Sequence, residues 1–161
     1  MSEIVKRSDK VAFFGVVNDG NVTYHRMKGF TDISVSRNPK EYSRQYVDEE
    51  FERTDVVGYA TSMSYGFDQH VGDAVHEDIV SIHDDELIGT DAVRSIIIVD
   101  FTKEATGGKY VARKREFSVI PDGEGNSMDA YTYSGTLKTA GDTVVGEATS
   151  SDSWETCTFA E

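Results

Sequence analysis

The chain has 161 residues and a mass of 17.8 kDa, which is enough for one domain whose core needs no disulfide or metal. Its formal net charge of −13 argues against the basic surface with which nucleic-acid-binding proteins displace counterions from phosphates. The longest apolar stretch, Ile96–Val99, is too short to span a membrane, and the first residues lack the apolar segment of a signal peptide, so we expect a single domain (1–161) without membrane insertion.

The acidity is unevenly distributed along the chain. Residues 1–40 carry seven basic and four acidic side chains, whereas residues 41–104 carry four basic and sixteen acidic ones. The simplest interpretation is a solvated acidic surface that favours solubility.

Near the N-terminus, alternating apolar and polar residues predict a β-hairpin. Two apolar runs, 11–17 and 22–27, flank the dipeptide Asp19-Gly20. Asp-Gly is typical of tight hairpin turns, in which both central residues have positive φ. The residues before the first run, about 1–10, are expected to form an N-terminal arm.

Residues 37–57 are expected to form a long loop. Tyr42 and Tyr46 would suit a helix face or one side of a strand. The acidic run that follows, residues 48–52, offers little apolar surface to hold a helix against a core. We therefore favour a strand or an extended loop here.

The strand pattern is clearest at residues 59–67. Bulky and small side chains alternate there, as in an antiparallel strand with one buried face. The bulky face consists of Tyr59, Thr61, Met63, Tyr65 and Phe67.

The period then changes to that of a helix, predicted over residues 73–88. Asp73 suits the N-cap position, and Val75, Ile79 and Ile82 recur at helical spacing. Gly89 is expected to terminate the helix, which should lie across a sheet.

Five more strands are expected after the helix, and the turn Ala140-Gly141-Asp142 should join two of them in a hairpin. The first of the five is apolar on both faces and should lie deepest, under the helix. Their predicted ranges are 92–102, 110–120, 129–138, 143–149 and 154–159. The fold class is therefore mainly β, an antiparallel β-sandwich or barrel of about eight to ten strands with one flanking α-helix.

The sequence carries no pattern typical of a catalytic, cofactor or metal site. His76 begins a string similar to a zinc-protease motif, but Val80 occupies the position of the second histidine. His83 would lie about 10 Å further along the helix, so we expect both histidines on its solvent face. Cys157, the only cysteine, is expected to be a buried, inert thiol.

Two kinds of charge cluster remain. The acidic runs 48–50 and 84–86 lack the spacing of a calcium loop and are interpreted as solvated charges. Arg113 and Arg115 share one face of a strand while Lys114 faces the other side, which is a poor arrangement for a phosphate groove. We expect this short basic patch to form salt bridges with an acidic neighbouring subunit.

In their order and spacing, several segments resemble the major tail tube proteins of long-tailed, siphovirus-like bacteriophages. The resemblance covers about residues 30–161. It rests on Tyr42-Ser-Arg-Gln-Tyr-Val-Asp-Glu-Glu, Val56-Val-Gly-Tyr59, Met63-Ser-Tyr-Gly-Phe-Asp68, Ile82-His-Asp-Asp-Glu-Leu-Ile-Gly-Thr-Asp-Ala92, Ile97-Ile-Val-Asp100, Tyr133-Ser-Gly-Thr-Leu-Lys138, Ala140-Gly-Asp-Thr-Val-Val-Gly146 and Thr158-Phe159.

The resemblance implies a structural virion protein without enzymatic activity or cofactor. Six copies would form a ring, and rings would stack into a tube through which phage DNA passes into the host. The implied partners are further copies of the chain, a tape measure protein inside the tube, and baseplate and tail terminator proteins. Assembly would take place in the host cytoplasm.

The resemblance also makes the 37–57 segment the loop that contacts the next ring. The candidate assembly residues are Tyr42, Arg44, Tyr46, Asp48, Glu49, Glu50, Phe51 and Arg53. An acidic lining of the tube would suit DNA passage, because carboxylates repel phosphates.

Three other functions remain open at this point. The chain could form the inner tube of a contractile tail or a related injection device. It could be a virion-displayed β-sandwich that binds carbohydrate or a receptor through Tyr131, Tyr133 and Trp154. An enzyme is the third alternative, but no set of residues in the sequence supports it.

Overall fold

The computed structural model describes residues 3–161, which form eleven strands, one α-helix and two short 3₁₀ helices. In chain order these elements are η1 (Arg7–Asp9), β1 (Lys10–Asn18), β2 (Asn21–Arg26), β3 (Phe30–Ser36), β4 (Pro39–Arg44), β5 (Arg53–Tyr59), β6 (Ser62–Asp68), α1 (Ala74–Asp84), η2 (Gly89–Ala92), β7 (Val93–Glu104), β8 (Tyr110–Glu124), β9 (Thr132–Thr139), β10 (Val144–Thr149) and β11 (Thr156–Ala160).

Six of the strands close into an antiparallel barrel. They pair in the order β10-β11-β2-β1-β7-β8, and β8 pairs back onto β10. The first hairpin of the barrel, β1–β2, is the one predicted from the sequence. Asp19 and Gly20 have φ values of 51° and 78°, as the two central positions of such a turn require.

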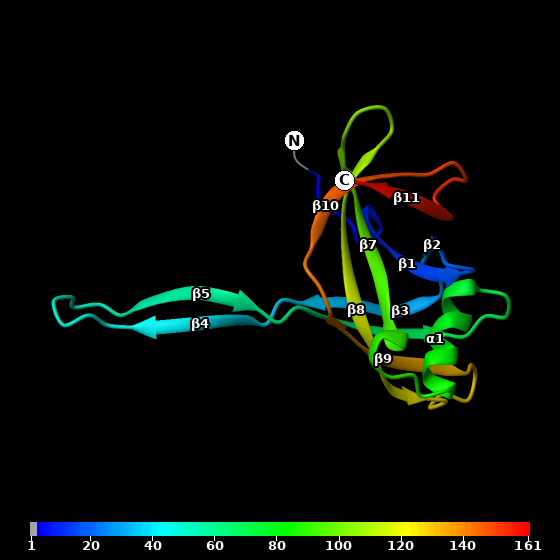
Figure 1. Ribbon diagram of the computed structural model, residues 1–161, viewed down its shortest axis with the longest axis horizontal. Helices are drawn as coiled ribbons and strands as arrows, with labels where there is room; N and C mark the ends of the chain where they lie inside the picture. The colour runs from blue at the N-terminus through cyan, green and yellow to red at the C-terminus, as the bar shows by residue number, and fades with distance from the viewer. Residues whose placement is uncertain (1–2) are drawn as a thin grey trace.

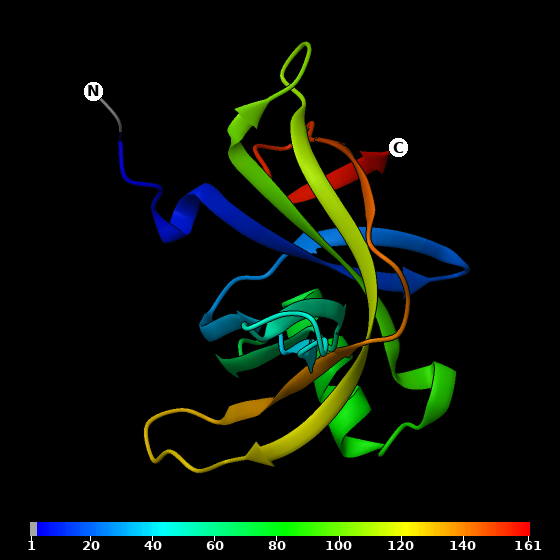
Figure 2. The ribbon, with the colours of Figure 1, turned by 90° about the vertical axis from the view of Figure 1, so that its left-hand side faces the viewer.

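The long strand β8 belongs to two parts of the fold at once. Residues 110–114 pair with β10 in the barrel, and residues 117–124 pair along the same edge with β9. From β9 the sheet continues through β6 to β3 as a second layer. Figure 2 shows β8, in yellow-green, running from the barrel down to this layer.

The predicted hairpin around Ala140-Gly141-Asp142 is wrong. β9 and β10 do not pair with each other but follow one another along β8. The Ala140 N–H donates to the Glu116 carbonyl over 2.8 Å, and Arg115 Nε donates to the Gly141 carbonyl over 2.7 Å. These bonds fix the point at which the chain crosses from the layer to the barrel.

Alternate residues of β1 and β7 serve two separate cores, which explains why β7 is apolar on both faces. The first core fills the barrel and includes Val11, Phe13, Ile97, Val99, Ala112, Ala148 and Cys157. The second lies between the barrel wall, the layer and α1, and includes Phe14, Met63, Tyr65, Phe67, Val75, Ile79, Ile82, Ile96, Phe117, Tyr133 and Leu137.

The helix begins where the sequence predicts but ends earlier. Asp73 Oδ1 accepts hydrogen bonds from the N–H groups of Val75 and His76, which confirms the N-cap. The helix ends at Asp84, so the predicted extension to residue 88 and the terminating role of Gly89 are wrong.

The residue that reverses the chain at the end of α1 is Glu86. Its φ is 50°, the Leu87 N–H donates to the Ile82 carbonyl over 3.2 Å, and the Glu86 N–H donates to the His83 carbonyl over 3.4 Å. This is the Schellman arrangement, in which glycine is the preferred residue. Gly89, with a φ of 62°, instead begins η2.

The predicted strand 59–67 also needs a correction at its start. Met63, Tyr65 and Phe67 are buried as expected. The strand itself begins at Ser62, and Tyr59 belongs to β5, where it is exposed.

Candidate assembly surfaces

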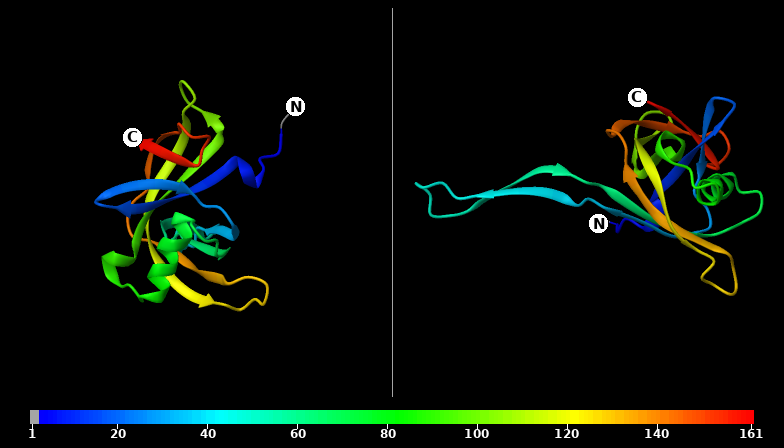
Figure 3. Two further views of the ribbon diagram at one scale, coloured as in Figure 1. Left: turned by 90° about the vertical axis from the view of Figure 1, so that its right-hand side faces the viewer. Right: turned by 60° about the horizontal axis from the view of Figure 1, so that its bottom comes forward.

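Strands β4 and β5 form a two-stranded hairpin of their own that pairs with no other described strand. The hairpin projects from the body of the molecule, on the side away from α1 (Figures 1 and 3). It occupies the segment expected to be a loop, 37–57, and continues to Tyr59. We call residues 45–52, which join the two strands, the hairpin tip.

The hairpin is anchored where it leaves the body by Asn38. This residue has a φ of 46°, which asparagine tolerates better than most residues. Its Nδ2 donates to the Ala60 carbonyl over 3.0 Å and to Ser62 Oγ over 3.2 Å, and its own carbonyl accepts from the Ala60 N–H over 3.2 Å. The two chains at the root are therefore tied together directly before Pro39.

All eight candidate assembly residues lie on this hairpin or its tip. Arg44 contacts two of the others: its guanidinium lies over the rings of Tyr42 and Tyr46, at 5.0 and 5.6 Å from the ring centroids. It also forms an ion pair with Asp55 of β5. Arg53 Nη1 lies 4.0 Å from Glu49 Oε1. Asp48, Glu50 and Phe51 have no such partner among residues 3–161 and point from the tip into solvent.

The hairpin exposes an unusual amount of apolar surface for an arm without a core. Phe51 is 78% exposed and Val47 fully exposed. The other exposed large apolar residues here are Tyr42, Tyr46, Val56, Val57 and Tyr59. Apolar side chains gathered in this way make the hairpin a candidate contact surface, because exposure of these side chains to water is unfavourable.

A second surface feature is a groove of about 630 Å³ between the barrel wall and the layer, close to the root of the hairpin. Its floor is apolar and comes from β1, β3, β6, β7 and β8. The floor residues are Ala12, Ile33, Val35, Met63, Ile96, Ile98 and Phe117.

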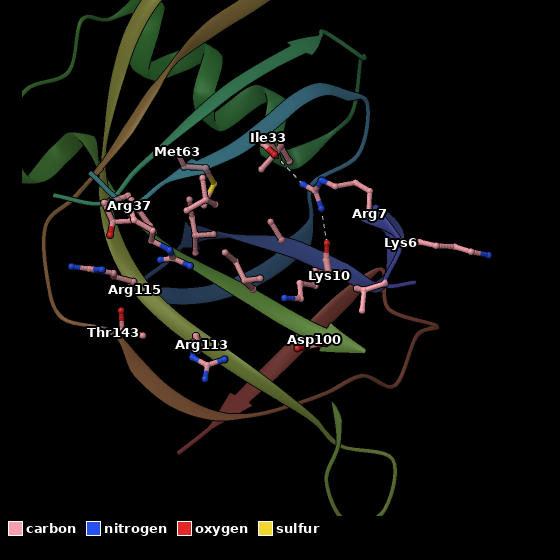
Figure 4. Close-up of a pocket in the computed structure, with 17 residues that line it drawn as sticks. Lys6, Arg7, Lys10, Ile33, Arg37, Met63, Asp100, Arg113, Arg115 and Thr143 are labelled. Atoms are coloured by element: carbon pink, nitrogen blue, oxygen red, sulfur yellow. Dashed lines mark hydrogen bonds between the residues drawn. The ribbon is translucent and has the colours of Figure 1, made fainter. Parts of the chain in front are cut away.

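The rim of this groove is strongly basic, although the chain as a whole is acidic. Six basic side chains and one acidic side chain line it (Figure 4). These are Lys6, Arg7, Lys10, Arg37, Arg113, Arg115 and Asp100. We call this feature the basic groove.

Hydrogen bonds hold part of the rim in place. Arg7 donates to the carbonyls of Lys10 and Ile33, over 2.6 and 3.2 Å, and Arg115 is fixed on Gly141. Asp100 accepts from the Thr102 hydroxyl, a bond that lowers the pKa of this carboxyl.

Three other basic side chains of the rim are not held in this way. Lys10, Arg37 and Arg113 have no hydrogen-bonded or ion-paired partner for their side chains within residues 3–161. The predicted split of the 113–115 run is correct, because Arg113 and Arg115 line the groove and Lys114 does not.

The two helix histidines are buried, which corrects the prediction that they lie on the solvent face. The ring of His76 stacks on Phe67 at 4.5 Å; its Nδ1 accepts from the His70 N–H over 3.0 Å and its Nε2 donates to the Lys28 carbonyl over 2.6 Å. His83 Nε2 lies 2.7 Å from the Tyr65 hydroxyl, and burial lowers the pKa of this imidazole. Both rings therefore join loops and strands to α1.

Cys157 and the three aromatic residues of the proposed sugar platform lie in different parts of the fold. Cys157 is buried in the barrel, and burial raises the pKa of its thiol to about 12, as expected for an inert cysteine. The ring centroids of Tyr131 and Tyr133 lie 5.4 Å apart. Trp154 instead packs against the barrel core, with its ring centroid 5.0 Å from that of Phe101, so the three aromatic residues form no common platform.

Residues 3–161 show neither a metal cluster nor a membrane-spanning helix. No group of three or more metal-ligating side chains is close enough to hold an ion. None of the helices described is both long and apolar enough to cross a membrane.

The fold is that of tail tube proteins. The chain superposes on a subunit of the SPP1 tail tube with a TM-score of 0.68 and 12% identity, over 88% of this chain and 78% of that one. It matches a subunit of the tail of an empty GTA particle, determined with C6 symmetry, with a TM-score of 0.63 and 12% identity, over 88% and 98% of the two chains.

A third solved structure has the same fold. A chain of the six-fold symmetrised baseplate of the anti-feeding prophage matches with a TM-score of 0.56 and 10% identity, over 90% of this chain and 97% of that one. No protein-family model and no curated protein sequence matches the chain.

Proposed function

We propose that the chain is a structural subunit of a phage tail, which assembles with further copies into a tube for the passage of DNA. The observation that carries this proposal is the projecting β4–β5 hairpin. Its two strands pair only with each other, and it exposes seven large apolar side chains. It belongs to a fold shared with subunits of assembled tails. Exposure of these apolar side chains to water is unfavourable, and contact with another copy would bury them.

The end of the second layer supports the same proposal. β3 pairs with β6 on one side and with no described strand on the other. An unpaired edge invites pairing with another chain, and a closed ring of copies leaves no such edge exposed. The C6 symmetry of the GTA tail and the six-fold symmetry of the anti-feeding prophage baseplate favour six copies in that ring.

The net charge of −13 suits a conduit for DNA. Carboxylates that face the interior would repel phosphates, and at physiological salt this repulsion would act over about 8 Å from the wall. The tape measure, baseplate and terminator proteins of a tail are the partners that this role entails, and the virion tail is the location.

The solved structures with this fold include the SPP1 tail tube and the baseplate of the anti-feeding prophage. The motif resemblance favours the flexible tail. The inner tube of a contractile device is the second candidate, and a sheath gene beside this one would decide for it.

The test is electron microscopy of the purified protein in negative stain at high concentration, alone and with tail-tip components that initiate growth. We expect hollow tubes of constant diameter with hexameric cross-sections. A protein that stays monomeric under both conditions would overturn the proposal, and monomers that bind glycans would favour a receptor-binding sandwich instead.

A further inference from the structure

The basic groove needs an occupant of defined chemistry. Its floor is apolar, so water in it gains few hydrogen bonds, while its rim presents six positive side chains against one carboxylate. The matching ligand combines apolar side chains with several negative charges. A free phosphate or a nucleic acid backbone would satisfy the rim but leave the floor uncovered.

The hairpin tip has this composition. Residues 45–52 contain four acidic side chains and no basic one. Between them stand Val47, which is fully exposed, and Phe51, which is 78% exposed. A turn closed by the Glu49 N–H on the Tyr46 carbonyl, over 3.0 Å, presents these side chains on a narrow end.

The tip cannot serve the groove of its own chain in this conformation. It lies at the far end of the projecting hairpin, whereas Arg37 at the hairpin root already lines the groove (Figures 1 and 4). A second copy is therefore the source of a tip that can enter.

We propose that the basic groove of one copy receives the hairpin tip of another copy. Phe51 and Val47 cover the apolar floor, and the carboxylates of Asp48, Glu50 and Glu52 meet the free cations of the rim. This inference rests on the proposed tube function and adds the receptor surface of the contact. It also explains why an acidic chain keeps a basic rim.

Charge reversal tests the pairing in both directions. The groove variant Arg37→Glu/Arg113→Glu and the tip variant Glu50→Lys/Glu52→Lys each place like charges together. We expect each variant to form at least tenfold fewer tubes than the wild type. The chain that carries all four substitutions restores opposite charges and should recover most of the assembly.

Matched controls change the same number of charges elsewhere. Lys103→Glu/Lys109→Glu lies at the β7–β8 turn, and Asp129→Lys/Glu161→Lys lies on other exposed sites. Both should assemble like the wild type. All these side chains lie on the surface or the groove rim, so the variants should fold. Circular dichroism and the melting temperature of each variant check that they do.

The outcomes separate this inference from the proposed function. If the wild type forms no tubes, the function fails. If the wild type forms tubes and the groove variant also assembles normally, or the fourfold variant does not recover, the groove is not the receptor.

Disulfide cross-linking gives a second measurement in the assembled state. A mixture of Phe51→Cys chains and Val35→Cys chains should yield covalent dimers on oxidation of the tubes, because the tip of one copy lies on the groove floor of another. The native Cys157 is buried and should not react. Assembled tubes that give no mixed dimer, with Phe51→Cys paired to Lys103→Cys as the control, would contradict the contact.

Discussion

Glu86 occupies a backbone conformation that favours glycine. Its φ of 50° lies in the left-handed region, which costs a residue with a Cβ about 1 kcal/mol or more. Glu86→Gly should therefore raise the free energy of unfolding by about 1 kcal/mol, measured by urea denaturation at pH 7. Glu86→Ala removes the same charge but keeps the Cβ, so a gain as large in this control would contradict the backbone explanation.

His83 makes the stability depend on pH. Burial lowers the pKa of its imidazole from 6.5, and this effect outweighs the opposite influence of Glu124 and Asp84. The unfolded chain thus takes up a proton near pH 6.5 that the folded chain refuses. The contribution of His83 is complete above that pH and is lost as the pH falls towards the folded pKa.

We expect a lower free energy of unfolding at pH 5.5 than at pH 7.5, and a smaller difference in His83→Gln. Denaturation curves at the two pH values measure it. If the variant and the wild type had the same pH dependence, other groups would be responsible.

At the scale of elements, the hairpin should be dispensable for folding. β4 and β5 pair only with each other, and neither core includes a residue of the hairpin. Replacement of residues 44–52 by a short Gly-Ser linker should change the melting temperature by only a few degrees, since it removes little buried surface. The same protein should form no tubes in negative stain, and normal tubes would rule out the hairpin as the assembly element.

Local signals in the sequence predicted those elements whose causes are local. Asp19-Gly20 gave the β1–β2 turn, and Asp73 gave the start of α1, because each depends on residues only a few positions away. The end of α1 could not be predicted, because a glutamate such as Glu86 does not indicate a positive φ. The burial of His76 was missed because it depends on Phe30 and Phe67, which approach only in the folded sheet.

The strand partners and the basic groove depend on contacts far apart in the chain. Residues 140–142 indicate a turn, but they do not indicate that β9 and β10 both pair with β8. The groove gathers Lys10, Arg37 and Arg113 from three separate segments. Only the alternation of the arginines in β8 could be recognised in advance, and it led to the expectation of an acidic neighbour.

At the scale of the whole molecule, β8 passes without interruption from the barrel to the second layer. Neither half keeps a complete hydrogen-bonded edge if the other separates, so the chain should melt as a single cooperative unit despite its two cores. Trp154, the only tryptophan, reports on the barrel through fluorescence, and the far-ultraviolet dichroism at 222 nm includes α1 on the other core. Coincident denaturation curves from these two probes are expected; a barrel that loses its tryptophan signal at lower urea would mean that the halves unfold in steps.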